Sequence, residues 1–337
     1  MTPRWRPLPR SGGPRPPGAL ALAGGPLWFA DVALHRPGRA PELRSVSELP
    51  EAERALLTAP RAAVAGLSLD RPRIMGILNV TPDSFSDGGA HVTLDAAVAR
   101  ARAMLAEGAD ILDIGGESTR PGAEPVPPEA EADRVVPVIA ALRAAGIAAP
   151  ISIDTRNPAV AVAAFAAGAD LWNDVAALGH APEGLAVAAA SGRPVCLMHA
   201  KGDPRTMQEA PVYGDVLLEV AGFLAARVAA AEGAGISRSA ILVDPGIGFG
   251  KTVAHNLTLI RGLSMLHGLG CGILFGASRK RFIGTIADVP VAAERVAGSV
   301  AVALEALRQG AQVLRVHDVK ETRQAVALWS ALNGIQE

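Results

Sequence analysis

The chain has 337 residues, half of them hydrophobic and 19% charged, with a formal net charge of −1. This length allows one large domain or two small ones with a sizeable core, and the near-neutral charge balance argues against a nucleic-acid partner. No uncharged apolar run reaches the length of about 18 residues that a membrane-spanning helix needs. The only cysteines, Cys196 and Cys271, are far apart in sequence, which excludes a disulfide framework and favours a reducing, cytoplasmic location.

Residues 1–70 are predicted to form a partly irregular N-terminal extension, followed by a catalytic domain at residues 71–337. Residues 1–18 are rich in Pro, Gly and Arg, so they cannot hold a long helix, and the broken apolar stretch after them argues against a secretory signal. We expect a strand at Leu27–Leu34 and a short helix at Ser47–Thr58, with a cap at its start. The extension either covers the closed end of the following domain or is partly disordered.

From Arg73 onward, short apolar runs alternate eight times with Ala-rich stretches of helical period. Apolar runs without alternation predict parallel strands buried on both faces. Eight such units over about 260 residues favour a (β/α)8 TIM barrel, and a doubly wound open sheet is the alternative. The expected strands are Ile74–Val80, Ile111–Gly115, Ile151–Thr155, Leu171–Val175, Val195–His199, Ile241–Pro245, Gly272–Gly276 and Val313–His317. The expected helices lie near residues 93–107, 129–145, 157–167, 182–191, 215–232, 253–262, 292–309 and 320–333.

The longest connections follow four of the predicted strands, at residues 81–92, 116–128, 200–214 and 277–291. In a barrel of this kind, the loops that follow the strands gather at the C-terminal face, where active sites are built. The uneven spacing of the strands therefore predicts that the functional site lies at this mouth of the barrel.

Polar residues mark the same end of the predicted strands. A single acidic residue there is more often a helix cap, but a polar group after every strand indicates a composite site, because buried charges need partners. Arg315 and His317 are two positions apart on one strand and therefore point to the same side. The set comprises Asn79, Asp113, Asp154, Asn173, Asp174, His199, Asp244, Ser278, Arg279, Lys280, Arg315 and His317.

These residue types suit two kinds of ligand. Asp154, Asp244 and Asn173 can hold a flat heterocycle with several N–H donors, such as an aminopyrimidine. Arg315, His317 and Asn79 suit a phosphate group, with or without Mg²⁺, which keeps most of its waters and touches few protein oxygens.

The segment Gly246–Thr252 reads GIGFGKT and resembles a phosphate-binding loop, but Pro245 stands where the Walker pattern requires glycine. We interpret it as a tight turn that leads into the next helix and exposes Phe249 to a ligand. The sequence leaves open whether His199 lines the mouth. The other histidines, His35, His91, His180, His255 and His267, are predicted to be surface or loop residues.

Five segments carry a family resemblance. Met75–Gly89 reads MGILNVTPDSFSDGG, Gly115–Gly122 reads GGESTRPG, Asp244–Lys251 reads DPGIGFGK, Gly276–Arg281 reads GASRKR and Arg315–Val319 reads RVHDV. In order and spacing, across roughly residues 73–333, these segments resemble the dihydropteroate synthases. That family joins (7,8-dihydropterin-6-yl)methyl diphosphate to 4-aminobenzoate, releasing diphosphate and giving 7,8-dihydropteroate in folate biosynthesis.

The resemblance implies a role for each matching residue. Asp154, Asn173, Asp244 and Lys280 would hold the pterin, with Met198 lining its pocket, and Asn79 would bind Mg²⁺. Arg315 and His317 would bind the diphosphate, and Val316 lies between them in the same motif. Thr119, Arg120, Pro121, Phe249 and the stem of Lys280 would contact the substrates or flank the 4-aminobenzoate ring, whose carboxylate would lie near the start of the helix after Lys280.

The chemistry of these residues is consistent with the resemblance. Mg²⁺, Arg315 and His317 would neutralise the departing diphosphate, and Asp113 and Asp154 would favour a cation at the pterin methylene. An SN1-like order without a covalent enzyme intermediate follows, because an arylamine is largely neutral and needs no strong base. The resemblance also implies a homodimer. Two other functions stay open, a methyltetrahydrofolate-binding methyltransferase domain and a non-catalytic pterin-binding paralogue.

Overall fold

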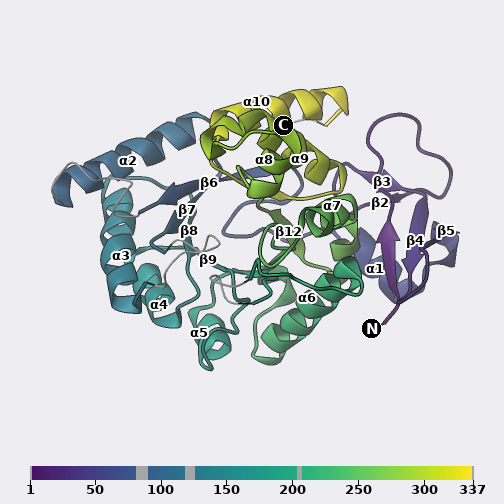
Figure 1. Cartoon of the computed structure of the whole chain (residues 1–337), viewed down its shortest axis with the longest axis horizontal. Helices are drawn as coiled ribbons and strands as arrows, with labels where there is room; N and C mark the ends of the chain where they lie inside the picture. The colour runs from purple at the N-terminus through teal and green to yellow at the C-terminus, as the bar shows by residue number, and fades with distance from the viewer. Residues whose placement is uncertain (1, 81–89, 118–125, 203–206, 336–337) are drawn as a thin grey trace.

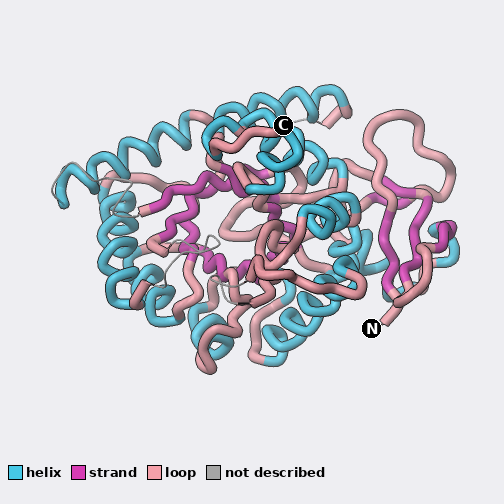
Figure 2. Tube along the Cα trace, viewed as in Figure 1, coloured by secondary structure: helices cyan, strands magenta, loops and turns pink. Residues whose placement is uncertain are grey.

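Eight parallel strands form a closed barrel within the described part of the chain (Figures 1 and 2). The computed structural model describes residues 2–80, 90–117, 126–202 and 207–335, with backbone alone at 90–93. The barrel closes because the last strand pairs with the first, with Val313 opposite Arg73, so the TIM barrel is confirmed and the open sheet is excluded. The strands are β6 (Arg73–Asn79), β7 (Ile111–Gly115), β8 (Ile151–Asp154), β9 (Leu171–Asp174), β10 (Val195–Met198), β11 (Ile241–Asp244), β12 (Gly272–Phe275) and β13 (Val313–Val316).

Helices surround the barrel at the places that the apolar period predicts. They are α2 (Ala90–Ala106), α3 (Pro128–Ala144), α4 (Pro158–Ala167), α5 (Gly184–Ser191), α6 (Val216–Gly233), α7 (Val253–Arg261), α9 (Val296–Arg308) and α10 (Val319–Leu332). The sequence did not predict α8 (Arg281–Ala287) or the 3-10 helix η4 (Leu263–Leu269), because both are short segments inside connections. Two further 3-10 turns are η3 (Arg238–Ala240) and η5 (Ala292–Glu294).

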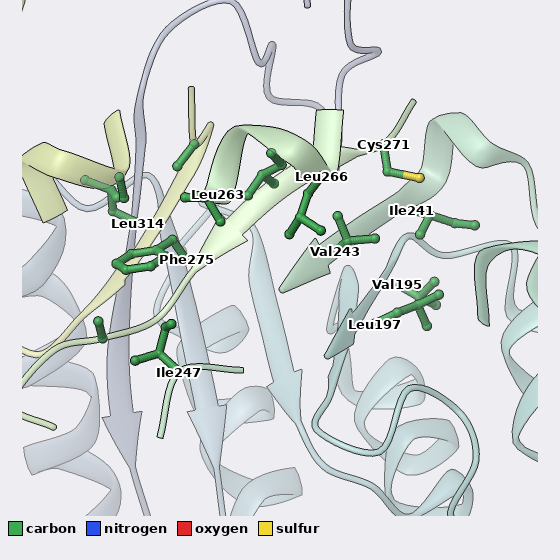
Figure 3. Close-up of a cluster of buried hydrophobic side chains, with 14 of the residues drawn as sticks. Val195, Leu197, Ile241, Val243, Ile247, Leu263, Leu266, Cys271, Phe275 and Leu314 are labelled. Carbon is green, nitrogen blue, oxygen red and sulfur yellow. The ribbon is translucent and has the colours of Figure 1, made fainter. Parts of the chain in front are cut away.

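The barrel strands bury side chains on both faces, as their unbroken apolar runs predict. On the outer face, Leu314, Phe275 and Ile247 belong to a large cluster that packs the strands against helices and connections (Figure 3). Met75, Leu242 and other residues form a second, smaller cluster with Val313. Val64 and Leu69, from the segment before the first barrel strand, belong to this second cluster. The cluster also contains Ile111 and Leu171, which are the first residues of β7 and β9. The segment therefore closes the N-terminal end of the barrel, and the polar residues lie at the opposite ends of the strands.

The N-terminal extension has more regular structure than the sequence predicts. A three-stranded antiparallel sheet contains β1 (Arg4–Pro7), β4 (Asp31–His35) and β5 (Glu42–Ser45), and β2 (Leu20–Ala21) pairs with β3 (Trp28–Phe29). The strand β1 was missed because its partner β4 lies far along the chain. The expected Leu27–Leu34 strand is divided into β3 and β4.

The expected Ser47–Thr58 helix is also divided, into η1 (Val46–Glu48) and α1 (Glu51–Thr58). The predicted cap position was wrong. Ser45 caps η1 in a capping box with Glu48, whereas α1 follows Pro50, which makes no side-chain cap.

The extension, which includes α1, packs on η4 at one end of the molecule, far from α2 and α3 (Figure 1). The Ser264 hydroxyl donates to the Pro7 carbonyl at 2.8 Å, and Arg61 donates to the His267 carbonyl at 3.0 Å. His267 and His35 are therefore buried, and their prediction as surface or loop residues was wrong. Burial, with the nearby Arg61, lowers the pKa of His267 to about 3. Among the described residues, no helix is long and apolar enough to cross a membrane.

Candidate active site

The register of the barrel aligns the predicted site residues at the C-terminal ends of the strands. Asn79 lies opposite Gly115, Gly115 lies opposite Asp154, and Asp154 lies opposite Asn173. On the next strand pair, Met198 lies opposite Asp244. Residues from six strands therefore meet around one mouth, as the loop lengths predicted.

Arg315 joins two acidic residues across this mouth. Its Nε donates to Asp113 Oδ2 and its Nη2 to Asp154 Oδ2, each at 2.6 Å. Burial lowers the pKa of Arg315, but the two carboxylates reverse this and raise it. The other carboxylate oxygen of Asp113, Oδ1, is buried and has no hydrogen-bond partner among the residues that the structure describes. A buried acceptor of this kind favours a positively charged or N–H-bearing ligand beside it.

The other carboxylates of the site are held in a partly desolvated state. Burial raises the pKa of Asp154 to about 7, although Arg315 opposes this shift. Burial also raises the pKa of Asp244, against the effect of Lys280. Oδ1 of Asp244 accepts a hydrogen bond from the Gly246 amide at 2.6 Å, which fixes the carboxylate at the start of the glycine-rich turn.

Lys280 stands at the entrance of α8, with its side chain directed back into the mouth. Its ammonium donates to the Ile247 carbonyl and lies 4.5 Å from the centroid of the Phe249 ring. Burial lowers the pKa of Lys280 to about 8, and Asp244 opposes this effect. The turn therefore presents an aromatic face and a cation side by side, and the exposure of Phe249 to a ligand stays a prediction.

His317 is linked to the loop that carries Lys280. Its Nδ1 lies 3.0 Å from the Ser278 hydroxyl, and its backbone amide donates to the same oxygen at 3.2 Å. The next residues form an ion pair, in which Arg279 Nε donates to Asp318 Oδ2 at 3.0 Å. The backbone of Arg279 has a φ of +59°, which residues other than glycine rarely adopt, and these contacts hold it in that conformation.

Most of the predicted site residues share this mouth, but Val316 points elsewhere. Its side chain packs in the hydrophobic layer between barrel and helices, so any contact with a substrate would involve its backbone. Thr119, Arg120 and Pro121 lie outside the described residues.

The structure adds residues that sequence reasoning did not single out. Glu117 pairs with Arg156 at 2.8 Å and accepts from the Val126 amide at 3.1 Å, so it joins the two ends of the second long loop. Lys251 is the second such residue, and its ammonium contacts the buried His199, for which the sequence left the role open. Two signals pointed to Lys251, namely its place in the GIGFGKT segment and the scarcity of lysine, since only four of the 32 Lys and Arg residues are lysines.

The chemistry of Asn79 is compatible with a magnesium site. Within the described ranges its side chain has no hydrogen-bond partner. Its Oδ1 lies beside Gly115, 3.7 Å from the position that a Cβ on this glycine would occupy. No group of three or more His, Cys, Asp or Glu residues that could hold a metal occurs in the described part of the chain. A cation here would therefore rely on one amide oxygen, water and substrate phosphate, which suits Mg²⁺.

A closed parallel barrel whose mouth combines acceptors for N–H groups with basic side chains is suited to a pterin-binding enzyme. Residues 75–317 match the family model described as "Pterin binding enzyme". A dihydropteroate synthase of Escherichia coli K12 is 47% identical over 80% of this chain and 95% of its own length.

Solved structures give the same result. Xanthomonas albilineans dihydropteroate synthase with 4-aminobenzoic acid is 52% identical, with a TM-score of 0.76 over 83% of this chain and all of that one. The same enzyme in complex with 7,8-dihydropteroate is 49% identical, with a TM-score of 0.74 over 82% of this chain and all of that one. The chain belongs to the dihydropteroate synthase family.

Proposed function

We propose that the chain condenses (7,8-dihydropterin-6-yl)methyl diphosphate with 4-aminobenzoate, giving 7,8-dihydropteroate and diphosphate. This is a transferase reaction of folate biosynthesis. The observation that carries the proposal is the convergence of Arg315, Asp113 and Asp154 with Asp244 and Lys280 at one mouth of the barrel. Membership of the dihydropteroate synthase family supports it independently.

The pterin would lie over the strand ends that carry Asp154, Asn173 and Asp244. Carboxylates accept N–H donors in pairs, and an Asn amide both donates and accepts, so the three side chains match the edge of an aminopyrimidine. Asn173 and Asp244 are buried, and a hydrogen bond to the ring is stronger there than in water because the local dielectric constant is low. Met198, beside Asp244 on the neighbouring strand, would supply apolar contact to the ring.

The diphosphate would lie near Arg315 and His317, which come from the same strand end. Mg²⁺ held by Asn79 and the substrate would neutralise charge on the leaving diphosphate. Arg315 is fixed by two carboxylates before the substrate arrives, so it needs little reorganisation as charge develops. The Ser278 hydroxyl orients the His317 ring toward the same region.

Departure of diphosphate would leave a cation at the pterin methylene, close to Asp113 and Asp154. The C–O bond breaks with its electron pair going to diphosphate, and the arylamine nitrogen then forms the C–N bond and loses one proton to solvent. Asp113 Oδ1, which accepts no hydrogen bond from the described residues, would stabilise the cation. In the absence of 4-aminobenzoate, a label in the bridging oxygen of the diphosphate should therefore change position; a label that stays in place would support concerted displacement instead.

The 4-aminobenzoate ring would be flanked by Phe249 and by the stem of Lys280, whose ammonium lies 4.5 Å from the centroid of the Phe249 ring. The position of its carboxylate near the start of α8 stays a prediction. So do Thr119, Arg120 and Pro121 as substrate contacts, and the cytoplasmic location.

One assay tests the function. Purified protein, pterin diphosphate, Mg²⁺ and 4-aminobenzoate should yield dihydropteroate, and a sulfonamide should compete with 4-aminobenzoate. A protein that binds pterin without product formation would be the non-catalytic paralogue, and transfer of a methyl group from methyltetrahydrofolate would indicate the methyltransferase.

We also infer that the chain is a homodimer that uses helices outside the barrel. Leu328 and Leu332 are 62% and 85% exposed and lie one turn apart on α10, so they form an apolar strip that a second copy could cover. Light scattering on the purified protein measures the mass directly, and replacing both leucines with Asp should yield a monomer.

A further inference from the structure

The turn of residues 246–250, which carries Phe249, is bound by side chains at every one of its carbonyl groups. Lys251 donates to Gly246 at 2.8 Å and to Phe249 at 2.9 Å. The remaining three carbonyls accept from three further side chains. Lys280 donates to Ile247, Gln208 to Gly248, and Tyr213 to Gly250, the last at 2.9 Å.

Lys251 is the central donor of this arrangement. Besides the two turn carbonyls, its ammonium contacts Nδ1 of His199 at 2.9 Å and the His199 carbonyl at 3.2 Å. The residue is 3% exposed, so none of these bonds is exchanged readily for water. A single buried cation therefore ties the turn after β11 to the end of β10.

The backbone of the turn depends on this connection. Gly246, Gly248 and Gly250 have φ values of +66°, +85° and +63°, so a Cβ would be strained at each of them. At Gly246 a Cβ would also collide with the His199 carbonyl, and at Gly250 with the Lys201 carbonyl. Glycine permits this conformation without selecting it, because it is equally free to adopt others. The bonds from Lys251 supply the selection.

We propose that Lys251 is a positioning residue, whose ammonium holds the 246–250 turn and thereby places Phe249 and Lys280 at the arylamine subsite. It does not contact the reacting atoms. The inference rests on the proposed function for the identity of that subsite, but the packing argument stands without it.

The charge on Lys251 is open to change near neutral pH. Burial and the positive charge of Lys280 lower the pKa of Lys251 to about 7, while Asp244 opposes the shift. His199, the other titratable group in contact, has its pKa lowered to about 3 by burial and Lys251, so it stays neutral and its Nδ1 can accept. The ammonium has three protons for four acceptors and the neutral amine has only two, so one more of the bonds that tie the turn to the end of β10 is lost above neutral pH.

The kinetic test compares Lys251→Met with Lys201→Met. Lys201 is an exposed lysine whose ammonium donates to Val212 and lies 4.2 Å from the Tyr213 ring centroid, and it does not donate to the turn. In Lys251→Met we expect KM for 4-aminobenzoate to rise about tenfold. The change in KM for the pterin diphosphate should be smaller, because Asp154 and Asn173, two of the proposed pterin residues, lie on strands that Lys251 does not contact. Lys201→Met should leave both KM values unchanged. An unchanged KM for 4-aminobenzoate in a folded Lys251→Met overturns the proposal.

A second readout needs no catalysis. The chain has only four lysines, so labelling with 13C-lysine gives four ε-methylene signals, each identified by replacing one lysine. The ring current of Phe249 shifts the Lys280 signal, and Phe249→Leu defines the signal without the ring. Lys251→Met should move the Lys280 signal toward the Phe249→Leu value; a signal that stays at the wild-type value overturns the proposal. If the protein makes no dihydropteroate at all, the proposed function fails while this signal still reports on Lys251.

The unmodified protein decides the question if Lys251→Met does not fold. The same labelling gives separate titration midpoints for Lys251 and Lys280. KM for 4-aminobenzoate should begin to rise at the Lys251 midpoint, before Lys280 titrates. A KM that stays flat through the Lys251 midpoint contradicts the proposal.

Discussion

Nη2 of Arg315 lies 2.6 Å from Oδ2 of Asp154, so the last strand of the barrel is joined to the third across the mouth. The pair is largely enclosed, with side-chain exposures of 21% and 12%. Buried pairs of this kind add little net stability, but removing one partner leaves an uncompensated charge. The pair therefore holds a cation and a carboxylate in fixed positions where we propose that the substrate binds.

Replacing Asp154 with Asn should reduce kcat/KM for the pterin diphosphate by at least about 100-fold, because loss of one buried charge typically costs about 3–5 kcal/mol. Asn cannot accept two N–H donors in the manner of a carboxylate, and Arg315 keeps only Asp113 as a partner. Initial rates at varied pterin diphosphate, with circular dichroism as a check of folding, measure the effect. A folded variant within about fivefold of the unmodified enzyme would remove Asp154 from the site.

The rate should fall as pH rises through about 8, the value to which burial lowers the pKa of Lys280. The ammonium is present below this pH and is lost above it, so the cation beside Phe249 and Asp244 disappears on the alkaline side. Rates at saturating substrates between pH 6 and about 9.5 give the profile. Lys280→Ala should cripple turnover and abolish this inflection while the unfolding temperature changes little; wild-type-like rates would exclude Lys280 from the mechanism.

Asn79→Ala should raise the Mg²⁺ concentration needed for half-maximal rate by about tenfold, because one of the few protein oxygens available to the cation is removed. A chelator should abolish activity in the unmodified enzyme, and added Mg²⁺ should restore it. Titration of the rate with Mg²⁺ in both proteins gives the comparison. Identical titration curves would show that Asn79 is not a ligand.

Removal of residues 1–59 should lower the unfolding temperature by at least about 5 °C while KM for both substrates changes less than about twofold. The segment buries Phe29, Val32 and Leu57 completely, and it packs on η4, which leads into the N-terminal end of β12. Differential scanning fluorimetry and steady-state kinetics provide the two measurements.

A single substitution tests the packing of the extension without removing it. Arg61→Ala deletes bonds to the carbonyls of Leu56, Ala59 and His267, and it should lower the unfolding temperature by a smaller amount than the truncation. A truncated enzyme with impaired substrate binding would contradict the separation of the extension from the mouth.

The barrel could be predicted because its signal is local. Each strand is a short apolar run, each helix repeats its apolar positions along a few turns, and polar residues follow every strand. Residue type and spacing alone therefore predict that Asp154, Asn173 and Asp244 lie at one mouth. Where the signal is weak, prediction failed, as at α8, at η4 and at the cap of η1.

The sequence by itself determined the order of strands and helices, the residues at the strand ends and the family resemblance, since these depend on local patterns along the chain. Only the tertiary structure decided that Arg315 bridges Asp113 and Asp154, that residues 64–69 close the barrel, and that Lys251 binds the turn beside Phe249. The physical reason is that these contacts join residues distant along the chain. Their geometry depends on how the whole barrel closes, and no short stretch of sequence contains that information.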